Sequence, residues 1–205
     1  TLKPLDTTPV AGSFASEVGV RLDFPADAAA ACPCFAGRLI RGVHNGESPE
    51  WLQRLLLAAG LRPISALVDI TNFLTFDLCR PLHVFDAGKL AGGLHVRLAR
   101  PGERLAALNG REYALTPAMT VVCDDAGPQA LGGVIGGEPT ACTGATTSVF
   151  VESALFDPVR TAGTGRALGI ASDARYRFER GIDATSVTWG LEIATRLILE
   201  VCGGE

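Results

Sequence analysis

The sequence has no apolar run near the roughly 20 residues that a membrane-spanning helix needs. Its N-terminal segment also lacks the basic start and apolar centre of a signal peptide. We therefore expect a soluble, intracellular protein. The chain begins at Thr1 rather than Met and ends directly after a strong helical pattern, so we expect a piece of a longer protein, although processing would leave similar ends.

Motifs for metal-dependent or covalent catalysis are also missing. The 3 histidines are not in H-x-x-x-H spacing, and Cys32 and Cys34 form a C-x-C pair rather than the C-x-x-C of zinc knuckles. No serine lies in G-x-S-x-G, and no cysteine stands beside an obvious base. We therefore expect no metal, and we interpret the 6 cysteines as buried or reduced thiols.

Acidic residues outnumber basic ones, and the net charge of −4 excludes a surface that binds nucleic acid indiscriminately. Arginine is nevertheless concentrated between residues 158 and 182. Such a cluster can hold phosphates through forked hydrogen bonds, or it can form a solvated face with internal ion pairs. Composition alone favours the solvated face. The members of the cluster are Arg160, Arg166, Arg175, Arg177 and Arg180.

The periodicity predicts a β-rich centre with helices toward both ends of the chain. Residues 1–31 carry no motif, and we interpret them as a linker or an edge extension. Strands are predicted at 34–43, 94–98, 119–123 and 147–155, with a hairpin at Asn109-Gly110. Helices are predicted from Ser48 with Pro49 in the first turn, from a cap within 69–72, over 157–168, and from Asp183. The sum is an α+β fold with a β-rich core flanked by helices.

Two features suggest a ligand pocket. Residues 131–137 read LGGVIGG, and glycine lets backbone approach a ligand closely, so this segment is either a bulged turn or a ligand-facing wall. Glu152 lies in an otherwise apolar strand, on the same face as Phe150 and Ala154. A carboxylate there needs a partner, which is either an arginine of the 160–180 cluster or a hydroxyl or amine of a ligand.

Three further polar residues have structural explanations. His83 lies in the apolar stretch 81–86, where a lone histidine is more often a satisfied core residue than a catalyst. Thr71 and Asn72 are equally explicable as helix caps. Residue pattern alone therefore suggests a pocket without identifying a reaction.

Four segments in order resemble the third and fourth domains of the bacterial-type phenylalanyl-tRNA synthetase beta subunit. They are 68–73 (VDITNF), 81–86 (PLHVFD), 131–137 (LGGVIGG) and 175–183 (RYRFERGID). The resemblance runs from residue 32 to residue 205, and it makes residues 1–31 the lead-in from a preceding domain. It implies two subdomains with an editing pocket at their interface, where tyrosine wrongly attached to phenylalanine tRNA is hydrolysed.

The resemblance also implies roles for individual residues. Glu152 reads the phenolic hydroxyl of tyrosine. Thr71, Asn72 and His83 lie by the ester and the terminal adenosine, where they position substrate and water. The wall of the pocket by the ring comprises Gly132, Gly133, Gly136 and Ala174.

Three departures from the family pattern affect the expected tRNA contacts and substrate preference. Arg80 stands where the family often has Gln, Arg175-Tyr176 replaces the usual Ser-His, and residues 164–167 are less basic than usual. Arg175, Arg177 and Arg180 are the expected tRNA contacts.

No residue is an obvious nucleophile, so we expect direct attack of water on the aminoacyl ester, aided by positioning and by backbone N–H groups. His83 acts either as general base or as an orienting group, and we favour orientation. An apolar pocket for phenylalanine rejects an added hydroxyl only about 100-fold, whereas a second site that requires the hydroxyl discriminates far better.

The resemblance implies a cytoplasmic enzyme whose partners are tRNA(Phe) and an alpha subunit, in an alpha2-beta2 heterotetramer without membrane contact. ATP and magnesium belong to the whole synthetase, and no cofactor is expected for this region. Two alternatives are a non-catalytic tRNA-binding or scaffold module and a free-standing protein that edits in trans. An intact Glu152, His83 and glycine wall argue against the first, and native chain length distinguishes the second.

Overall fold

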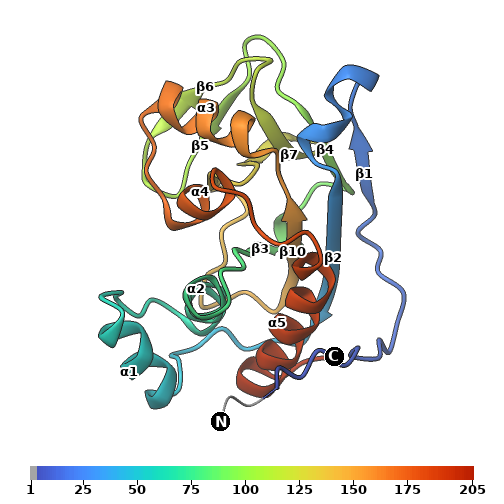
Figure 1. The fold of residues 1–205 in the computed structure, drawn as a ribbon. Coiled ribbons are helices and arrows are strands. Elements are labelled where there is room, and N and C mark those ends of the chain that lie inside the picture. Colours follow the sequence, from blue (N-terminus) through green and yellow to red (C-terminus); the bar gives the residue numbers. More distant parts are fainter. Residues whose placement is uncertain (1–3) are drawn as a thin grey trace.

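Strand β10 (Ser148–Leu155) runs through the centre of the molecule and is almost entirely buried (Figure 1). In the computed structural model, which describes residues 4–205, β10 pairs antiparallel with β2 (Cys34–Arg41) and with β3 (His83–Asp86). Its side chains alternate as predicted, because Val149 and Val151 enter one core while Phe150 and Ala154 enter another. Glu152 therefore lies on the second face, among apolar neighbours.

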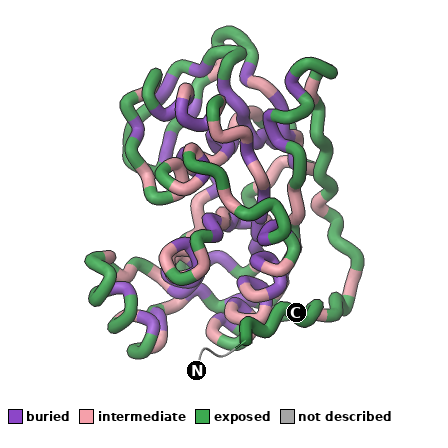
Figure 2. The backbone as a smooth tube through the Cα atoms, viewed as in Figure 1, coloured by how far each residue is buried: buried purple, intermediate pink, exposed green. Residues whose placement is uncertain are grey.

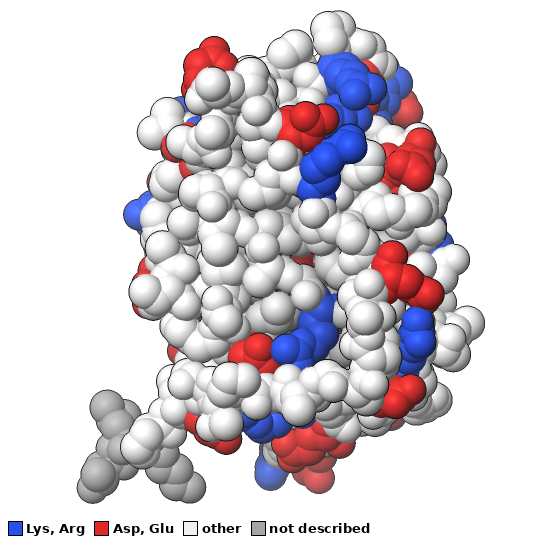
Figure 3. Space-filling model, turned by 90° about the vertical axis from the view of Figure 1, so that its right-hand side faces the viewer, with Lys and Arg blue, Asp and Glu red and all other residues white. Residues whose placement is uncertain are grey.

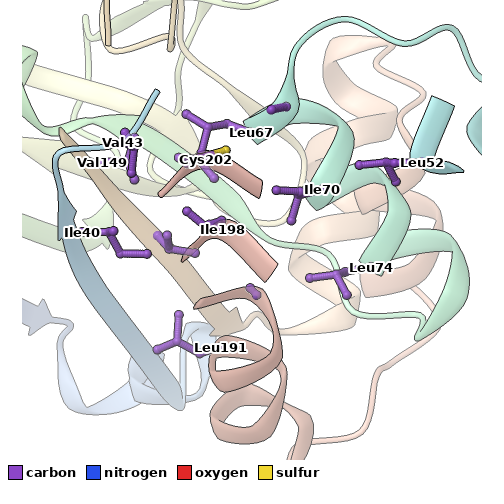
Figure 4. Packing of buried hydrophobic residues seen from close by; sticks show 14 of the residues in the cluster. Ile40, Val43, Leu52, Leu67, Ile70, Leu74, Val149, Leu191, Ile198 and Cys202 are labelled. Carbon is purple, nitrogen blue, oxygen red and sulfur yellow. The ribbon is translucent and has the colours of Figure 1, made fainter. Parts of the chain in front are cut away.

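Two helices, α2 (Ala66–Asp77) and α5 (Ser186–Cys202), cover the first face of this sheet, and a third, α1 (Glu50–Ala58), packs on α2. α2 also packs against α5. Their apolar side chains join Ile40 and Val149 of the sheet in one cluster (Figure 4). Among residues 4–205, no helix combines the length and the apolarity needed to cross a membrane.

A five-stranded sheet covers the second face. Its order is β1 (Val20–Asp23), β4 (Leu94–Leu98), β7 (Thr120–Asp124), β8 (Gly127–Leu131) and β9 (Ile135–Gly136). β1 runs parallel to β4, and the other neighbours are antiparallel. Leu94 and Val96 pack in the same cluster as Phe85 and Phe150, so the two sheets share a core. The predicted α+β class with a β-rich core is confirmed.

The remaining elements extend the structure around the five-stranded sheet. The hairpin of β5 (Arg104–Ala106) and β6 (Glu112–Ala114) turns at Asn109-Gly110, as predicted. α3 (Pro158–Leu168) also has its predicted bounds, with the Asp157 carboxylate accepting from the Arg160 amide at 2.7 Å. The short α4 (Asp173–Phe178) was not predicted. Two 3-10 turns, η1 (Ala26–Ala31) and η2 (Ala87–Lys89), complete the chain.

The N-terminal segment lies largely exposed along the outside of the molecule (Figure 2). Its contacts with α5 include hydrogen bonds from the Val10 amide to Glu192 at 2.8 Å and from Arg196 to the Asp6 carbonyl at 2.9 Å. Val20–Asp23 then adds an edge strand, which matches the interpretation as an edge extension. Residues 1–3 of this segment lie outside the described residues.

Several predicted helix caps are wrong. The Ser48 hydroxyl donates to the buried Asp69 carboxylate instead of capping α1, and Pro49 occupies the N-cap position. Asp69 and its neighbours to residue 72 lie inside α2, because that helix begins at Ala66. Asp183 accepts from the Thr185 amide at 2.9 Å in the turn before α5, which begins at Ser186. For Ser48, the partner that decides the geometry lies 21 residues away in the chain.

Candidate functional site

A cavity of about 70 Å³ lies where β3 and β10 meet the β8–β9 hairpin and α4. This volume exceeds what a single water requires. Its walls are mostly apolar, and its ionisable groups are Glu152 and His83. It is lined by Pro81, Leu82, His83, Glu152, Ala174 and Phe178 and, from the hairpin, by Ala130, Leu131, Gly133, Val134, Ile135 and Gly136.

Glu152 and His83 are direct neighbours across β10 and β3. Side chains in this relationship share one face of the sheet, with Cβ atoms about 5 Å apart. Oε2 of Glu152 and Nε2 of His83 are both shielded from solvent, and neither has a hydrogen-bond partner among residues 4–205. Because buried polar atoms are normally paired, two unpaired ones at one cavity indicate a place for a ligand.

Burial shifts the pKa values of Glu152 and His83 in opposite directions. Burial raises the pKa of Glu152 to about 7, against the opposing effect of the positive charge on Arg80. Burial lowers the pKa of His83 to about 4. At neutral pH the imidazole is therefore uncharged, and the carboxyl group is near its titration midpoint.

The glycines of segment 131–137 shape one wall. A Cβ at Gly136 would lie 2.3 Å from Cε1 of His83, so only glycine lets the hairpin approach the imidazole. Gly133 has a φ of 70° and packs close to the rings of Phe156 and Phe178. Gly132 is not part of the cavity lining, since it packs against Phe156. The segment is thus both a turn, as one interpretation held, and a wall of the cavity.

Helix α4 contributes a second wall and is anchored to the first. The Ser172 hydroxyl accepts from the Arg175 amide at 3.1 Å and donates to the Val134 carbonyl at 2.6 Å. This bond ties the start of α4 to the glycine segment. Ala174 and Phe178 then face the cavity from the helix.

Thr71 and Asn72 are not among the residues that line the cavity. Both are half-buried on α2, and the Thr71 hydroxyl donates to the Val68 carbonyl at 2.8 Å. Of the predicted site residues, the structure brings together His83, Glu152, Gly133, Gly136 and Ala174 at one cavity, without Thr71, Asn72 and Gly132.

The expected tRNA-contacting arginines pair with nearby acidic and aromatic groups. Arg175 pairs with Glu179 at 2.9 Å, and Arg177 pairs with Asp173 at 3.2 Å. Arg180 pairs with Glu179 at 2.9 Å and stacks on Tyr176. The face in Figure 3 likewise carries basic and acidic groups side by side. These contacts match the interpretation as internal ion pairs, and a role in tRNA binding stays a prediction.

Of the two partners considered for Glu152, an arginine of the 160–180 cluster is not observed beside it among residues 4–205. The charge that acts on Glu152 is that of Arg80, which is fully buried. Phe178, Pro81 and Leu82 also border the cavity without having been singled out. Their position in the sequence could have indicated them, because each lies within one of the family-like segments or directly beside one. The four residues are Arg80, Pro81, Leu82 and Phe178.

Other chemistry has little support among residues 4–205. No group of three or more His, Cys, Asp and Glu side chains there is placed to hold a metal ion. Burial raises the pKa of the Cys32, Cys123, Cys142 and Cys202 thiols. These four thiols are therefore protonated at neutral pH and are poor nucleophiles.

Comparison with known proteins identifies the family of the chain. The model of the B3/4 domain family matches residues 31–203. The whole chain is 62% identical to 26% of a phenylalanine–tRNA ligase beta subunit from Paramagnetospirillum magneticum, and 57% identical to 25% of the one from Cereibacter sphaeroides. An N-terminal fragment of the phenylalanyl-tRNA synthetase beta subunit from Pyrococcus horikoshii aligns with 80% of this chain and 53% of its own, with 13% identity and a TM-score of 0.48. The chain thus spans about a quarter of the length of these bacterial relatives.

Proposed function

The chain belongs to the B3/4 domain family, and we propose that its cavity is an editing site that hydrolyses tyrosyl-tRNA(Phe). The observation that carries this proposal is the unpaired Glu152 carboxylate oxygen at a mostly apolar cavity. The similarity of the whole chain to phenylalanine–tRNA ligase beta subunits supplies the aminoacyl ester as substrate class.

The unpaired carboxylate accounts for discrimination between tyrosine and phenylalanine. A tyrosine ring in the cavity would donate its phenolic hydroxyl to Glu152 and satisfy Oε2. A phenylalanine ring would displace water from the same place and leave the acceptor buried and unpaired, which costs about 1–3 kcal/mol. The site thus favours the amino acid that the synthetic pocket of a ligase rejects poorly.

The hydrolytic step needs a water molecule and an acceptor for developing charge. Water adds to the ester carbonyl carbon, the bond to the ribose oxygen breaks, and the ribose oxygen takes a proton while tyrosine leaves as a carboxylic acid. Nε2 of the neutral His83 imidazole is free to hydrogen-bond this water or the ribose. A histidine with so low a pKa is a weak general base at neutral pH, which supports an orienting role. The amides of Gly132, Val134 and Gly137 already donate to backbone carbonyls, so the candidate donors to the oxyanion are other backbone N–H groups of the 131–137 segment.

The rest of the proposed enzyme lies beyond this chain. In a complete ligase, an alpha subunit would use ATP and magnesium to activate phenylalanine, and an alpha2-beta2 assembly would bind tRNA(Phe). Thr71 and Asn72 on α2 would then lie toward the terminal adenosine. Arg175, Arg177 and Arg180 would exchange internal contacts for phosphates.

The test is deacylation of tyrosyl-tRNA(Phe), with phenylalanyl-tRNA(Phe) as the control substrate. We expect the complete ligase to release tyrosine selectively and the same enzyme with Glu152→Ala to lose that selectivity. If the substituted ligase still edits normally, the cavity is not the editing site. Running the isolated 205-residue chain in parallel shows whether it acts alone. An active ligase with an inactive isolated chain means that tRNA contacts lie elsewhere in the enzyme.

A further inference from the structure

Arg80 is a fully buried arginine with no carboxylate within 4.0 Å among the described residues. Its guanidinium instead donates to neutral acceptors on three elements. Nε donates to the Pro81 carbonyl at 3.2 Å, Nη1 to the Ser186 hydroxyl at 3.1 Å, and Nη2 to the Ala154 carbonyl. It therefore joins the segment before β3, the end of β10 and the start of α5.

The fold makes room for this side chain. A Cβ at Gly190 of α5 would lie 2.6 Å from Cγ of Arg80, so glycine there lets the arginine stem pass the helix. The guanidinium carbon lies 5.7 Å from the ring centroid of Phe178. A buried charge without an ionic partner is destabilising, so its presence calls for an explanation beyond packing.

Arg80 lies behind the cavity that holds Glu152. Two of its contacts, Pro81 and Phe178, line that cavity, and a third, Ala154, lies two residues beyond Glu152 on the same face of β10. We propose that Arg80 is a positioning residue that braces β10 against α5 and supplies the positive charge that favours the ionised form of the acceptor Glu152. The part of this inference that concerns substrate choice rests on the proposed editing function.

The electrostatic surroundings of Glu152 make Arg80 the decisive charge. His83 on β3 is uncharged at neutral pH, because burial lowers its pKa to about 4. Cys32, just before β2, is a protonated thiol whose pKa is raised by burial. Asp183, in the turn before α5, and Cys34 on β2 raise the pKa of Arg80 and so favour its charged form. Arg80 itself stays charged at neutral pH, since burial lowers its pKa only to about 10.

Ionisation matters because a hydrogen bond from a phenol to a carboxylate is roughly twice as strong as one between neutral groups. Burial raises the pKa of Glu152 to about 7 although the Arg80 charge lowers it. Without the arginine charge, the carboxyl group would be mostly protonated at neutral pH. The protonated carboxyl group would be a weaker acceptor for the tyrosine hydroxyl. Raising the pH would restore the ionised form of Glu152 and with it the stronger hydrogen bond.

The direct test is the titration of Glu152 in this chain. The titration is monitored by NMR, with glutamate labelled with carbon-13 at the side-chain carboxyl. Glu152→Gln identifies the signal by its loss. Arg80→Gln removes the charge while keeping hydrogen-bond donors, and Arg80→Lys keeps the charge. Arg38→Gln is the matched control, because Arg38 pairs with Glu192 on the other side of the central sheet.

We expect Arg80→Gln to raise the titration midpoint of Glu152 by about one pH unit or more, and Arg80→Lys to leave it near the wild-type value. Arg38→Gln should not move it. An unchanged midpoint in folded Arg80→Gln would overturn the proposal and leave Arg80 as a brace only. If Arg80→Gln does not fold, a wild-type midpoint in Arg80→Met stabilised by osmolyte would have the same meaning.

A second readout links the charge to substrate choice in the complete ligase. Arg80→Gln should reduce the preference for tyrosyl over phenylalanyl ester several-fold at pH 7 and recover most of it at pH 8.5. A loss that is equal at both pH values would indicate bracing without the electrostatic role. If wild-type ligase shows no preference while the NMR midpoint moves, the proposed editing function fails and the electrostatic role of Arg80 stands.

Discussion

Glu152 and His83 stand opposite each other on β10 and β3, and each has a buried side-chain atom without a hydrogen-bond partner in the described part of the chain. The pair is unusual because the two groups border one cavity and leave their hydrogen-bonding capacity open to it. A fold that buries polar atoms unpaired sacrifices stability, so the arrangement points to a bound molecule that completes the bonds.

Removing the Glu152 carboxyl group should reduce selectivity more than turnover. We expect Glu152→Ala to weaken the preference for tyrosyl over phenylalanyl ester by ~1–3 kcal/mol, because the hydroxyl loses its acceptor. The measurement is the ratio of deacylation rates for the two charged tRNAs. Glu192→Ala serves as control, since Glu192 is equally buried but contacts Arg38 and the N-terminal segment. An equal loss of the preference for tyrosyl ester in both variants would mean that the effect comes from impaired folding.

Gly136→Ala should disrupt the cavity through a steric clash. The added methyl carbon would lie 2.3 Å from the His83 imidazole, so the ring or the hairpin must move. We expect deacylation to fall about 10-fold or more, since small displacements of positioning groups have large effects on rate. Gly163→Ala on α3 is the matched control, because its methyl group would meet nothing within 4 Å. Normal activity in Gly136→Ala would argue that the imidazole takes no part.

His83→Asn should distinguish orientation from general-base catalysis. Asparagine keeps a hydrogen-bonding group but cannot take up a proton at neutral pH. If His83 orients water or the ribose, the variant retains part of the deacylation rate, and substrate binding is little changed. Loss of turnover with intact binding would instead assign His83 as the base. Binding is measured with a non-hydrolysable amide analogue of tyrosyl-adenosine.

The pH dependence of stability should reveal the two groups separately. The folded-state pKa of Glu152 is about 7, above its usual 4.5, so its contribution to stability falls as pH rises from about 4.5 to 7. The folded-state pKa of His83 is about 4, below its usual 6.5, so its contribution rises with pH from about 4 to 6.5. The two effects oppose each other in the wild-type chain.

Single substitutions should therefore unmask opposite slopes. In Glu152→Gln, the free energy of unfolding should rise between pH 4 and 6.5, and in His83→Asn it should fall between pH 4.5 and 7. Urea unfolding at a series of pH values provides the measurement. Parallel curves for the two variants would show that at least one group is not buried in solution.

Cys79→Gly should stabilise the chain. Cys79 is exposed, has a φ of 51°, and turns the backbone between α2 and Arg80. A side chain in this left-handed region is disfavoured by about 1–2 kcal/mol, part of which glycine loses again through its greater freedom in the unfolded chain. We expect a net gain of about 0.5–1 kcal/mol in urea unfolding, and none for Cys79→Ala, which keeps a Cβ. A gain in stability for Cys79→Ala as well would mean that removal of the thiol, rather than relief of the backbone conformation, causes the effect.

Local sequence determined much of the secondary structure. The alternation along 148–155 predicted which side chains of β10 share a face, and Asn109-Gly110 and Asp157 marked a hairpin and a helix start that the structure confirms. These signals work because strand periodicity, turn geometry and capping depend on residues only a few positions apart. The same alternation set Glu152 on an apolar face.

Tertiary structure decided the partners of the buried polar groups. Arg80, not an arginine of the 160–180 cluster, acts on Glu152, and Ser48 bonds to Asp69 instead of capping a helix. Thr71 and Asn72 lie inside α2 rather than at its start. Such contacts join residues far apart in the chain, and they depend on how sheets and helices pack. Local propensity contains no information on that packing, so the sequence by itself determined many of the elements, while the tertiary structure determined α4, the helix starts and the cavity.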